Sequence, residues 1–592
     1  MINFLSTTRK EFEELGWHQV DIILLTGDTY IDSPYIGAAL IGKYLVLQGF
    51  KVGIIAQPDV NSEIDITRLG EPKLFWGVTS GSVDSMVANY TPLKKRRKSD
   101  DFTPGGINNR RPDRAIIIYT NLIKQYFKNT APIVLGGIEA SLRRVAHYDY
   151  WSNKIRKSIL FDAKADILIY GMAEKSISQL AKNIRSKQTY KHIHGLCFID
   201  TIAPDNFINL PSFSECAKDK DKFTKMFTTF YQNNDPTTAS GLCQRYDNRY
   251  LIQNPPAPIL TVSELDSIYN IKYSRNVHPY YQNLGKVKAQ DTIKFSLTTH
   301  RGCYGECNFC AIAVHQGRTV ISRSTGSIIR EAKHLTSHPD FKGNISDVGG
   351  PTANMYGYEC DRKQVKGVCI NKRCIYPQVC KNLPVNHATY TTLLEAISKI
   401  PKVKRVFVAS GIRYDLLFSD KKGPLCLRQI VSKHTSGQMK IAPEHTVGKI
   451  LAVMGKPGSS QLIEFKRQFD DLSKQANKKQ FLTYYFIAAH PGTTMADMKS
   501  LKEFCLTKLN CAPEQVQIFT PTPSTYSTLM YWTERDPFTG KKLMVEKNTS
   551  QKERQKAILT RKPGRNNIGC RISNQNKDRS FVGSKVCKIC KK

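Results

Sequence analysis

The first third of the chain alternates short apolar runs with stretches of helical spacing. Residues 21–26, DIILLT, form an apolar run that ends in a Gly-Asp turn, as a buried parallel strand would. Residues 37–48 follow with helical spacing, Gly49 ends that helix, and residues 52–56 are typical of a second strand. Further strands are expected at residues 115–119, 133–135 and 167–170. This alternation predicts a doubly wound α/β domain over residues 1–195.

The periodicity weakens between residues 196 and 288, where the run NPPAP at 254–258 indicates a stiff connector. We therefore expect this region to be a bridging segment. From residue 289 to 535 strand and helix signals alternate again, with strands expected at 293–297, 345–348, 405–409, 439–442, 482–487 and 516–519. Six such strands are enough for a partial (β/α)6 barrel, in which chemistry takes place on the loops that follow the strands.

Length and charge add two constraints to this pattern. A chain of 592 residues is too long for one hydrophobic core, which agrees with several domains. The formal net charge of +37 favours an anionic substrate or RNA as a partner, unless it reflects only a general lysine bias. Residues 541–592 hold 16 Lys and Arg against three acids, which predicts a basic, largely flexible tail over residues 536–592.

The cysteines and the N-terminus indicate the compartment. The N-terminus has no apolar core typical of a signal peptide, and no apolar run approaches the ~18 residues that cross a bilayer. Sixteen cysteines are clustered rather than spread, and the first is Cys197. We expect a reducing, cytoplasmic location without a membrane partner, where clustered cysteines are metal ligands or redox groups.

Three cysteines share one short loop directly after the first expected barrel strand. The stretch HRGCYGECNFC places Cys303, Cys307 and Cys310 at the spacing C-x3-C-x2-C. Three thiolates would hold three irons of a 4Fe–4S cluster and leave the fourth iron open for a small molecule. The alternative from the residues alone is a zinc ion with a distant fourth ligand.

With Phe309 before the last cysteine, the loop resembles the C-x3-C-x-aromatic-C signature of the radical SAM superfamily. The resemblance implies that the open iron binds S-adenosylmethionine through its amino and carboxylate groups. It also implies that an electron passed through the cluster cleaves adenosylmethionine to a 5′-deoxyadenosyl radical, which abstracts hydrogen from a substrate.

The resemblance extends to the YgiQ-type family of radical SAM proteins and covers residues 1–535. It implies an N-terminal domain like the cobalamin domain of some radical SAM enzymes, followed by the radical SAM barrel. The family has no firmly assigned substrate, so the resemblance identifies the class of chemistry only. The matching motifs lie at residues 26–30, 55–59, 101–115, 347–357 and 441–445.

Within the barrel, the resemblance assigns cofactor-binding positions after three further strands. Gly349 and Gly350 stand where the backbone often receives the methionine amino group, although Pro351 replaces the usual acid. A tight turn is the alternative interpretation.

Ser410 and Arg413 follow the third strand and Glu444 follows the fourth. Such positions often bind the ribose or the carboxylate of adenosylmethionine, and arginine suits a carboxylate because it offers two parallel donors. A surface salt bridge or a helix cap is equally compatible with these residue types.

A second set of cysteines lies in an insertion at residues 358–382. Four cysteines within 21 residues favour a closed metal site, which could hold zinc or an auxiliary iron–sulfur cluster. Unligated thiols in a basic loop are the alternative. The tail holds a further C-x2-C that is more typical of ordinary thiols. The insertion cysteines are Cys360, Cys369, Cys374 and Cys380, and the tail cysteines are Cys587 and Cys590, with Cys570 nearby.

Two further motifs have weaker interpretations. Residues 94–98, KKRRK, could bind phosphate or direct localisation, but a solvated loop is the expected structure. In the loop at residues 32–37, Pro34 stands where the cobalamin motif D-x-H-x-x-G has histidine, and proline cannot coordinate cobalt. We therefore expect no cobalamin. Asp28 and Asp32 remain candidate polar contacts for another ligand.

The sequence thus predicts a radical SAM enzyme with one 4Fe–4S cluster and an electron donor such as a flavodoxin or ferredoxin. A methylthiotransferase is disfavoured because no cysteine precedes Cys197. The alternative function is a non-catalytic iron–sulfur protein that binds nucleic acid through its basic surface. A protein that only stores or assembles a cluster is a third, weaker hypothesis.

Overall fold

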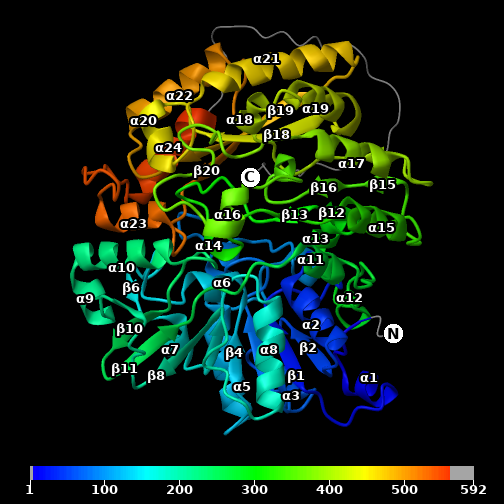
Figure 1. The fold of residues 1–592 in the computed structure, drawn as a ribbon, viewed down its shortest axis with the longest axis vertical. Helices are drawn as coiled ribbons and strands as arrows, with labels where there is room; N and C mark the ends of the chain where they lie inside the picture. Colours follow the sequence, from blue (N-terminus) through cyan, green and yellow to red (C-terminus); the bar gives the residue numbers. More distant parts are fainter. Residues whose placement is uncertain (1–3, 561–592) are drawn as a thin grey trace, which may run out of the picture.

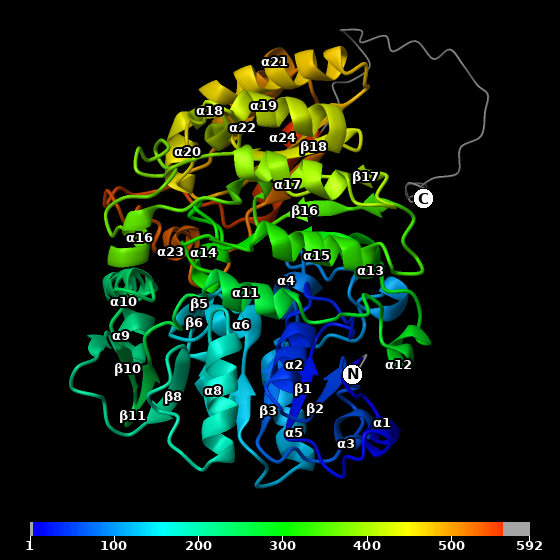
Figure 2. The ribbon, with the colours of Figure 1, turned by 45° about the vertical axis from the view of Figure 1, so that its right-hand side comes forward.

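The computed structural model of the chain describes residues 4–560. Figures 1 and 2 show two α/β halves stacked on one another, with the N-terminal half (blue to cyan) below the second half (green to orange). The C-terminal cysteines Cys570, Cys587 and Cys590, and the tail beyond residue 560, lie outside the described residues.

The lower half is built on one mixed sheet with the order β2-β1-β3-β4-β7-β8-β11-β10-β9. Its first five strands are parallel. The chain passes from β1 to β2 on one side and then crosses to β3 on the other side of β1, so a topological switch point lies between β1 and β3. This confirms the predicted doubly wound α/β fold. The five strands are β1 (Ile22–Thr26), β2 (Val52–Ala56), β3 (Phe75–Thr79), β4 (Ile133–Leu135) and β7 (Ile167–Ile169).

Helices cover both faces of this sheet, because the parallel strands are apolar on both sides. One face packs on α5 and α7 and the other on α2 and α8. The helices of this half are α1 (Arg9–Glu14), α2 (Gly37–Leu47), α3 (Ile64–Thr67), α4 (Ser85–Asn89), α5 (Ala115–Tyr126), α6 (Gly137–Leu142), α7 (Ile159–Ala163) and α8 (Glu174–Arg185). A hairpin of β5 (His147–Asp149) and β6 (Lys154–Arg156) follows α6.

The prediction of a strand at residues 115–119 was wrong, because this stretch is the first part of α5. Its buried residues Ala115, Ile116, Tyr119, Leu122 and Ile123 recur at helical spacing, and the short apolar window hid that period. The strand that fills the gap in the sheet is β3, which the sequence pattern did not single out.

The expected bridging segment contains strands of the same sheet. Cross-strand pairing attaches β8 to β7 in antiparallel fashion and adds β11, β10 and β9 beyond it. Only the part after residue 253 passes between the halves. The elements are β8 (Leu196–Asp200), β9 (Ile208–Leu210), α9 (Phe213–Lys218), α10 (Lys220–Gln232), β10 (Leu242–Tyr246), β11 (Arg249–Gln253), α11 (Val262–Tyr269), α12 (Pro279–Gln282) and α13 (Lys288–Ile293).

The upper half contains a strand that overlaps each of the six predicted barrel positions, although the first strand starts only at Ser296 and Ile293 ends helix α13. Neighbouring strands run parallel, and backbone bonds such as Val348 N to Phe407 O (3.1 Å) connect the short pieces. The strands are β12 (Ser296–Thr298), β15 (Asn344–Ile345) with β16 (Asp347–Gly349), β17 (Arg405–Val406), β18 (Gln438–Glu444), β19 (Phe481–Ala488) and β20 (Gln515–Ile518). A two-stranded ribbon of β13 (His300–Arg301) and β14 (Ile321–Ser322) flanks the first strand.

The barrel core lies between these strands and the helices outside them. Leu297, Val348, Ile441 and Phe486 from the strands are buried with apolar residues of the surrounding helices. The helices are α14 (Ile312–His315), α15 (Thr325–Leu335), α16 (Asp361–Lys366), α17 (Ala388–Ser398), α18 (Tyr414–Ser419), α19 (Gly423–Gln429), α20 (Gly448–Met454), α21 (Ser460–Gln475), α22 (Met495–Thr507), α23 (Tyr526–Thr533) and α24 (Thr549–Thr560).

Helix α24 lies within the stretch predicted to be a flexible tail. Leu559 is buried in the barrel core, and Gln555 accepts a hydrogen bond from the backbone N of Ala489 (2.9 Å). The local excess of charge concealed these two buried residues, so the tail prediction fails for residues 549–560. None of the helices between residues 4 and 560 is long and apolar enough to cross a membrane.

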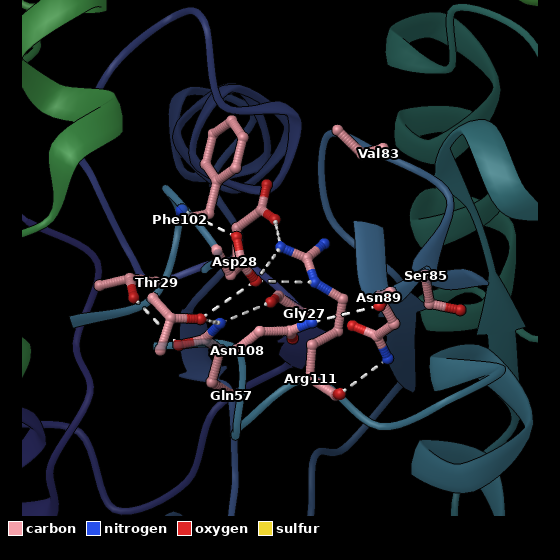
Figure 3. Close-up of polar contacts among 12 residues, drawn as sticks. Gly27, Asp28, Thr29, Gln57, Val83, Ser85, Asn89, Phe102, Asn108 and Arg111 are labelled. Carbon is pink, nitrogen blue, oxygen red and sulfur yellow. Dashed lines mark hydrogen bonds and ion pairs between the residues drawn. The ribbon is translucent and has the colours of Figure 1, made fainter. Parts of the chain in front are cut away.

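A buried ionic cluster stabilises the switch point of the lower sheet (Figure 3). Arg111 Nη2 lies 2.9 Å from Asp28 and 3.0 Å from Asp100, and Arg111 Nη1 donates to Ser80 O (2.9 Å). Burial raises the pKa of Asp28 while the Arg111 guanidinium opposes that rise. Because all three charged side chains are buried, each depends on the others to compensate its charge.

We predict that Arg111→Ala lowers the stability of the lower half by about 3–5 kcal/mol, because it leaves Asp28 and Asp100 buried without their cation. Hydrogen exchange of the β1 and β3 amides would measure the loss. Arg110→Ala is the matched control, with an expected effect within about 0.5 kcal/mol. Equal protection in the two variants would contradict the structural role of Arg111.

Candidate functional site

The three-cysteine loop begins where β13 ends and is held by contacts on several sides. Asn308 makes three of them: its backbone N donates to Met454 O (2.9 Å), its Nδ2 donates to Val453 O (2.8 Å), and its Oδ1 accepts from Arg373 Nη2 (2.7 Å). On the other side of the loop, the Tyr304 hydroxyl donates to Tyr358 O. The loop is therefore fixed by the polar residues between its cysteines.

The same loop is joined to the lower half at both of its ends. Before it, Arg301 Nη1 donates to Glu174 Oε1 at the start of α8 (2.5 Å), and both side chains are buried. After it, His315 in α14 lies 3.0 Å from Ser141 Oγ in α6. These contacts bring the carboxyl-terminal edge of the lower sheet against the cysteine loop.

All three cysteines line one cavity of about 190 Å³, which we call the cysteine cavity. Phe309, Arg413 and Glu444 line it too, so three of the six predicted cofactor-binding residues lie beside the thiols. Residues that the sequence did not single out complete the wall: Glu306, Thr352, Asp415 and Lys456. Glu306 lies within the cysteine signature and Thr352 within the motif at residues 347–357. Asp415 and Lys456 lie outside the matching motifs, so no sequence signal marked them.

The chemistry of this cavity fits an iron–sulfur cluster. Burial, and then the neighbouring thiols, raise the pKa of Cys310 to about 12, so without a metal the thiol stays protonated. A side chain at Gly305 would place its Cβ 3.2 Å from Cys303 Sγ and 3.6 Å from Cys307 Sγ, so only glycine leaves the space between the sulfurs open. The Gly305 N–H donates to Cys303 Sγ (3.3 Å), a contact that favours a thiolate.

The described residues contain no group of three or more His, Cys, Asp or Glu side chains arranged around a single metal ion. The absence of such a group does not argue against a 4Fe–4S cluster, because each cysteine of that cluster binds a different iron. It does leave the second cysteine set without structural support.

A chain of polar contacts positions Arg413 beside the thiols. Arg413 Nη1 lies 3.9 Å from Cys307 Sγ, and its Nε donates to Asp415 (2.9 Å). Burial lowers the pKa of Arg413, but Asp415 and the thiols outweigh that effect and raise it overall. Asn354 holds the Arg413 backbone from both sides, at 2.9 Å each, and in turn contacts His387 (3.1 Å).

Glu444 reaches the cavity through an irregular strand end. The register of β18 against β19 shifts before Glu444, and its φ of 68° lies in the left-handed region that non-glycine residues seldom adopt. Lys456 Nζ lies 3.7 Å from Glu444 Oε1. Burial raises the pKa of Glu444, and Lys456 opposes it.

The other three predicted residues, Gly349, Gly350 and Ser410, lie outside the cysteine cavity. They line a separate cavity of about 550 Å³ between the two halves, which we call the interdomain cavity. A Cβ at Gly350 would lie 2.7 Å from the His300 ring, so packing by itself requires glycine there. Ser410 bonds to Asp347, and Pro351 lines both cavities. The assignment of these residues to adenosylmethionine stays a prediction.

The two aspartates of the N-terminal domain differ in position. Asp28 lines the interdomain cavity, whereas Asp32 is buried away from it and bonds to Lys43 (3.1 Å) and to the backbone N of Ser274 (2.7 Å). Asp32 therefore has a structural role.

The insertion cysteines lie near the cysteine loop but on its outer side. Cys360, Cys374 and Cys380 pack in one apolar cluster with Tyr304, and Cys369 is outside it. Burial raises the pKa of Cys374 to about 11, and the Lys363 ammonium opposes the rise. A second metal site here, zinc or iron–sulfur, stays a prediction.

The interior of the barrel forms a third cavity of about 870 Å³, which we call the lumen cavity. Along β18 and β20 residues that face the helices are buried, and alternate residues such as Lys440 and Gln517 are exposed toward the interior. Phe309, Ala442 and Glu444 line both this cavity and the cysteine cavity. The KKRRK loop, expected to be solvated, contributes Lys95 and Arg97 to its wall.

Comparison with known proteins identifies the family of this chain. Residues 4–296 match a family model described as Radical SAM N-terminal, and residues 514–568 match a domain of unknown function, DUF3362. A UPF0313 protein of Fusobacterium nucleatum is 58% identical over 563 residues, which cover 95% of this chain and 99% of that protein. The chain belongs to the UPF0313 family. A UPF0313 protein of Thermotoga maritima is 50% identical, again over 95% of this chain and 99% of its own length.

These matches confirm that this UPF0313 protein is of radical SAM type. Its fold agrees with that membership: a radical S-adenosylmethionine methyltransferase from Kitasatospora setae, TsrM, superposes with a TM-score of 0.50 at 14% identity. The match covers 86% of this chain and 76% of TsrM, whose structure holds cobalamin and a 4Fe–4S cluster.

This similarity contradicts the prediction that no cobalamin is expected. TsrM, which shares this fold, holds cobalamin, and the UPF0313 protein has an interdomain cavity at the edge of its N-terminal sheet. Pro34, which lines that cavity, cannot coordinate cobalt. The error was to infer from one missing imidazole that the cofactor is absent, because a cavity can bind a ligand without a bond to its metal.

We predict that Gly305→Ala lowers the iron affinity of the UPF0313 protein by roughly 10- to 100-fold, because its methyl group enters the space between two sulfurs. Iron content and visible absorbance after anaerobic reconstitution would measure the change. Gly448→Ala is the control, because a Cβ there meets open space. Full iron loading of Gly305→Ala would show that the cluster does not occupy this space.

Proposed function

We propose that this protein binds a 4Fe–4S cluster through Cys303, Cys307 and Cys310 and cleaves S-adenosylmethionine reductively to start radical chemistry on a substrate. The observation that carries the proposal is the set of three thiols in one cavity whose described wall contains no fourth cysteine and no histidine. A donor set of this kind leaves one iron open. When bound there, such a cluster would supply the electron and the coordination site for cleaving adenosylmethionine.

The surrounding residues suit the second ligand. Arg413 binds Asp415 through Nε and Nη2, and its backbone is held by Asn354, so the side chain is in place before a ligand arrives. Its Nη1, beside Cys307 Sγ, remains to donate to a carboxylate. Glu444 offers an acceptor for a hydroxyl or an amino group. Phe309 lines both the cysteine cavity and the lumen cavity, so a hydrogen-abstracting group formed beside the thiols would lie next to a substrate held in the lumen cavity.

An enzyme of this kind also needs a one-electron donor, and we propose a small redox protein such as a flavodoxin or ferredoxin. Such chemistry also needs water kept away from the reacting groups, because water would divert a reactive intermediate into side reactions. A cytoplasmic location stays a prediction.

The test is anaerobic reconstitution with iron and sulfide, followed by dithionite and adenosylmethionine. We expect the wild-type protein to produce 5′-deoxyadenosine and Cys307→Ala to produce at least about 100-fold less. Removing a cluster ligand should reduce activity more than changing a residue that only supports a ligand. Liquid chromatography of the products provides the measurement. Cys426→Ala, in the barrel core, is the matched control and should retain product formation.

Absence of 5′-deoxyadenosine from iron-loaded wild-type protein would overturn the proposal. It would then favour the alternative function, a non-catalytic iron–sulfur protein that binds nucleic acid.

We further propose that the interdomain cavity binds cobalamin. Two buried polar atoms of its wall, Glu174 Oε2 and His300 Nε2, have no hydrogen-bond partner among the described residues. Burial lowers the pKa of His300 to about 3, so its ring is neutral at pH 7. The cavity lies at the carboxyl-terminal edge of a doubly wound sheet, where such folds bind their ligands.

Gly136→Trp tests this second proposal, because a Cβ at Gly136 meets open space in the cavity and a large side chain would fill it. We expect hydroxocobalamin to bind the wild-type protein and to bind Gly136→Trp at least about tenfold more weakly, a change of about 1.4 kcal/mol. Changes in visible absorbance on titration give the affinities. Gly136→Ala should bind like wild type, and equal binding by all three proteins would place cobalamin elsewhere.

A further inference from the structure

The lumen cavity has a charged mouth and an aromatic interior. At the mouth, Lys95 and Arg97 come from the loop after α4, and Lys556 comes from the last turns of α24. Deeper residues include Phe309, Tyr485 and Gln517. The cavity is therefore built from both halves of the molecule and is joined to the cysteine cavity at Phe309, Ala442 and Glu444.

The loop that presents Lys95 and Arg97 is held in place by its own backbone. Thr91 N donates to Lys95 O (2.8 Å), and Arg97 N donates to Asn89 O (2.7 Å). Arg97 Nε bonds only to a backbone oxygen, that of Val87 (3.2 Å), so its guanidinium has no acid partner among the described residues. The basic run is thus an ordered part of the cavity rim.

Negative charge does not neutralise this rim. The carboxylates that line the cavity are Glu444 and Glu553. Glu444 is paired with Lys456. Glu553 pairs with Lys95 (2.8 Å), and their side chains are 48% and 68% exposed. Because exposed pairs of this kind are weak, a ligand anion can replace Glu553 as the partner of Lys95.

The three cations and the aromatic interior together define a class of ligand. Arginine and lysine at a cavity mouth bind phosphate, with arginine supplying paired donors. Tyr485 and Phe309 offer ring faces on which a base can stack, and the Gln517 amide can donate to it and accept from it. The volume of about 870 Å³ is in the range of small-molecule sites.

We infer that the substrate of this protein is a phosphate-bearing nucleoside unit, with its phosphate at Lys95, Arg97 and Lys556 and its base or ribose inside the barrel. The inference rests on the proposed function, because it places the reacting atom next to the cysteine cavity. The unit can be a free nucleotide or a nucleotide within RNA, since both present the same groups to the cavity. The described part of the DUF3362 match, residues 514–560, supplies much of the wall and would contribute to substrate choice.

The experiment measures binding without adenosylmethionine or reductant. A short fluorescein-labelled single-stranded RNA of mixed sequence is titrated with reconstituted protein at several salt concentrations, and anisotropy reports the affinity. We expect Lys95→Ala/Arg97→Ala to bind about tenfold more weakly than wild type. The slope of the logarithm of the binding constant against the logarithm of salt concentration should become shallower by roughly 1 to 2.

The matched control is Lys98→Ala/Lys128→Ala, which removes the same charge from exposed positions outside the cavity wall. It should bind within about twofold of wild type, because general surface attraction contributes less than specific phosphate contacts. A control that loses as much affinity as the test variant would overturn the inference.

An equimolar mixture of ribonucleoside 5′-monophosphates, added as competitor, separates the two sources. Displacement of the RNA indicates that a free nucleotide suffices, and retention of the RNA indicates a nucleotide within a polymer. A wild-type protein that cleaves adenosylmethionine but binds neither probe overturns the inference and leaves the proposed function standing. A protein that binds the RNA at Lys95 and Arg97 without cleaving adenosylmethionine overturns the proposed function, and with it the role of this unit as a substrate, and leaves only the nucleotide-binding site.

Discussion

The buried ion pair between Arg301 and Glu174 is the interaction on which the rest of the arrangement depends. Arg301 immediately precedes the cysteine loop, and Glu174 begins α8 of the lower half. Both charges are removed from water, so each needs the other, and the pair holds only if the two halves meet in one register. It thereby sets the position of the thiols relative to the edge of the N-terminal sheet.

Three cavities follow from that register and meet along the cysteine loop. The interdomain cavity adjoins the cysteine cavity at Ile312 and Pro351, and the cysteine cavity adjoins the lumen cavity at Phe309. Such a series would let a cofactor, a radical precursor and a substrate lie next to one another. The arrangement also explains why Gly349, which ends β16, and Ser410, which follows β17, line the interdomain cavity instead of the cysteine cavity.

Membership in the UPF0313 family and similarity of fold to TsrM constrain function at different levels. Identity of 58% along nearly the whole chain shows the family, whereas 14% identity to TsrM shows a shared architecture only. The cobalamin question illustrates the difference. Proline at position 34 excludes only one way of binding cobalamin, through an imidazole bond to cobalt. The cavity, which many strand ends line, can still hold a ligand without that bond.

The sequence by itself determined the elements whose signal is local. The apolar strands around residues 22–26 and 52–56, the six barrel strands and the spacing of Cys303, Cys307 and Cys310 all depend on neighbours within a few residues. Only the tertiary structure decided which distant residues meet: Asn354 with Arg413, the KKRRK loop with α24, and β8 to β11 with the first sheet. These contacts depend on packing between segments far apart in the chain, so the periodicity of apolar residues within a segment cannot predict them. For the same reason the charge of residues 536–560 concealed a helix whose three buried residues, Lys552, Gln555 and Leu559, are identified only by what they touch.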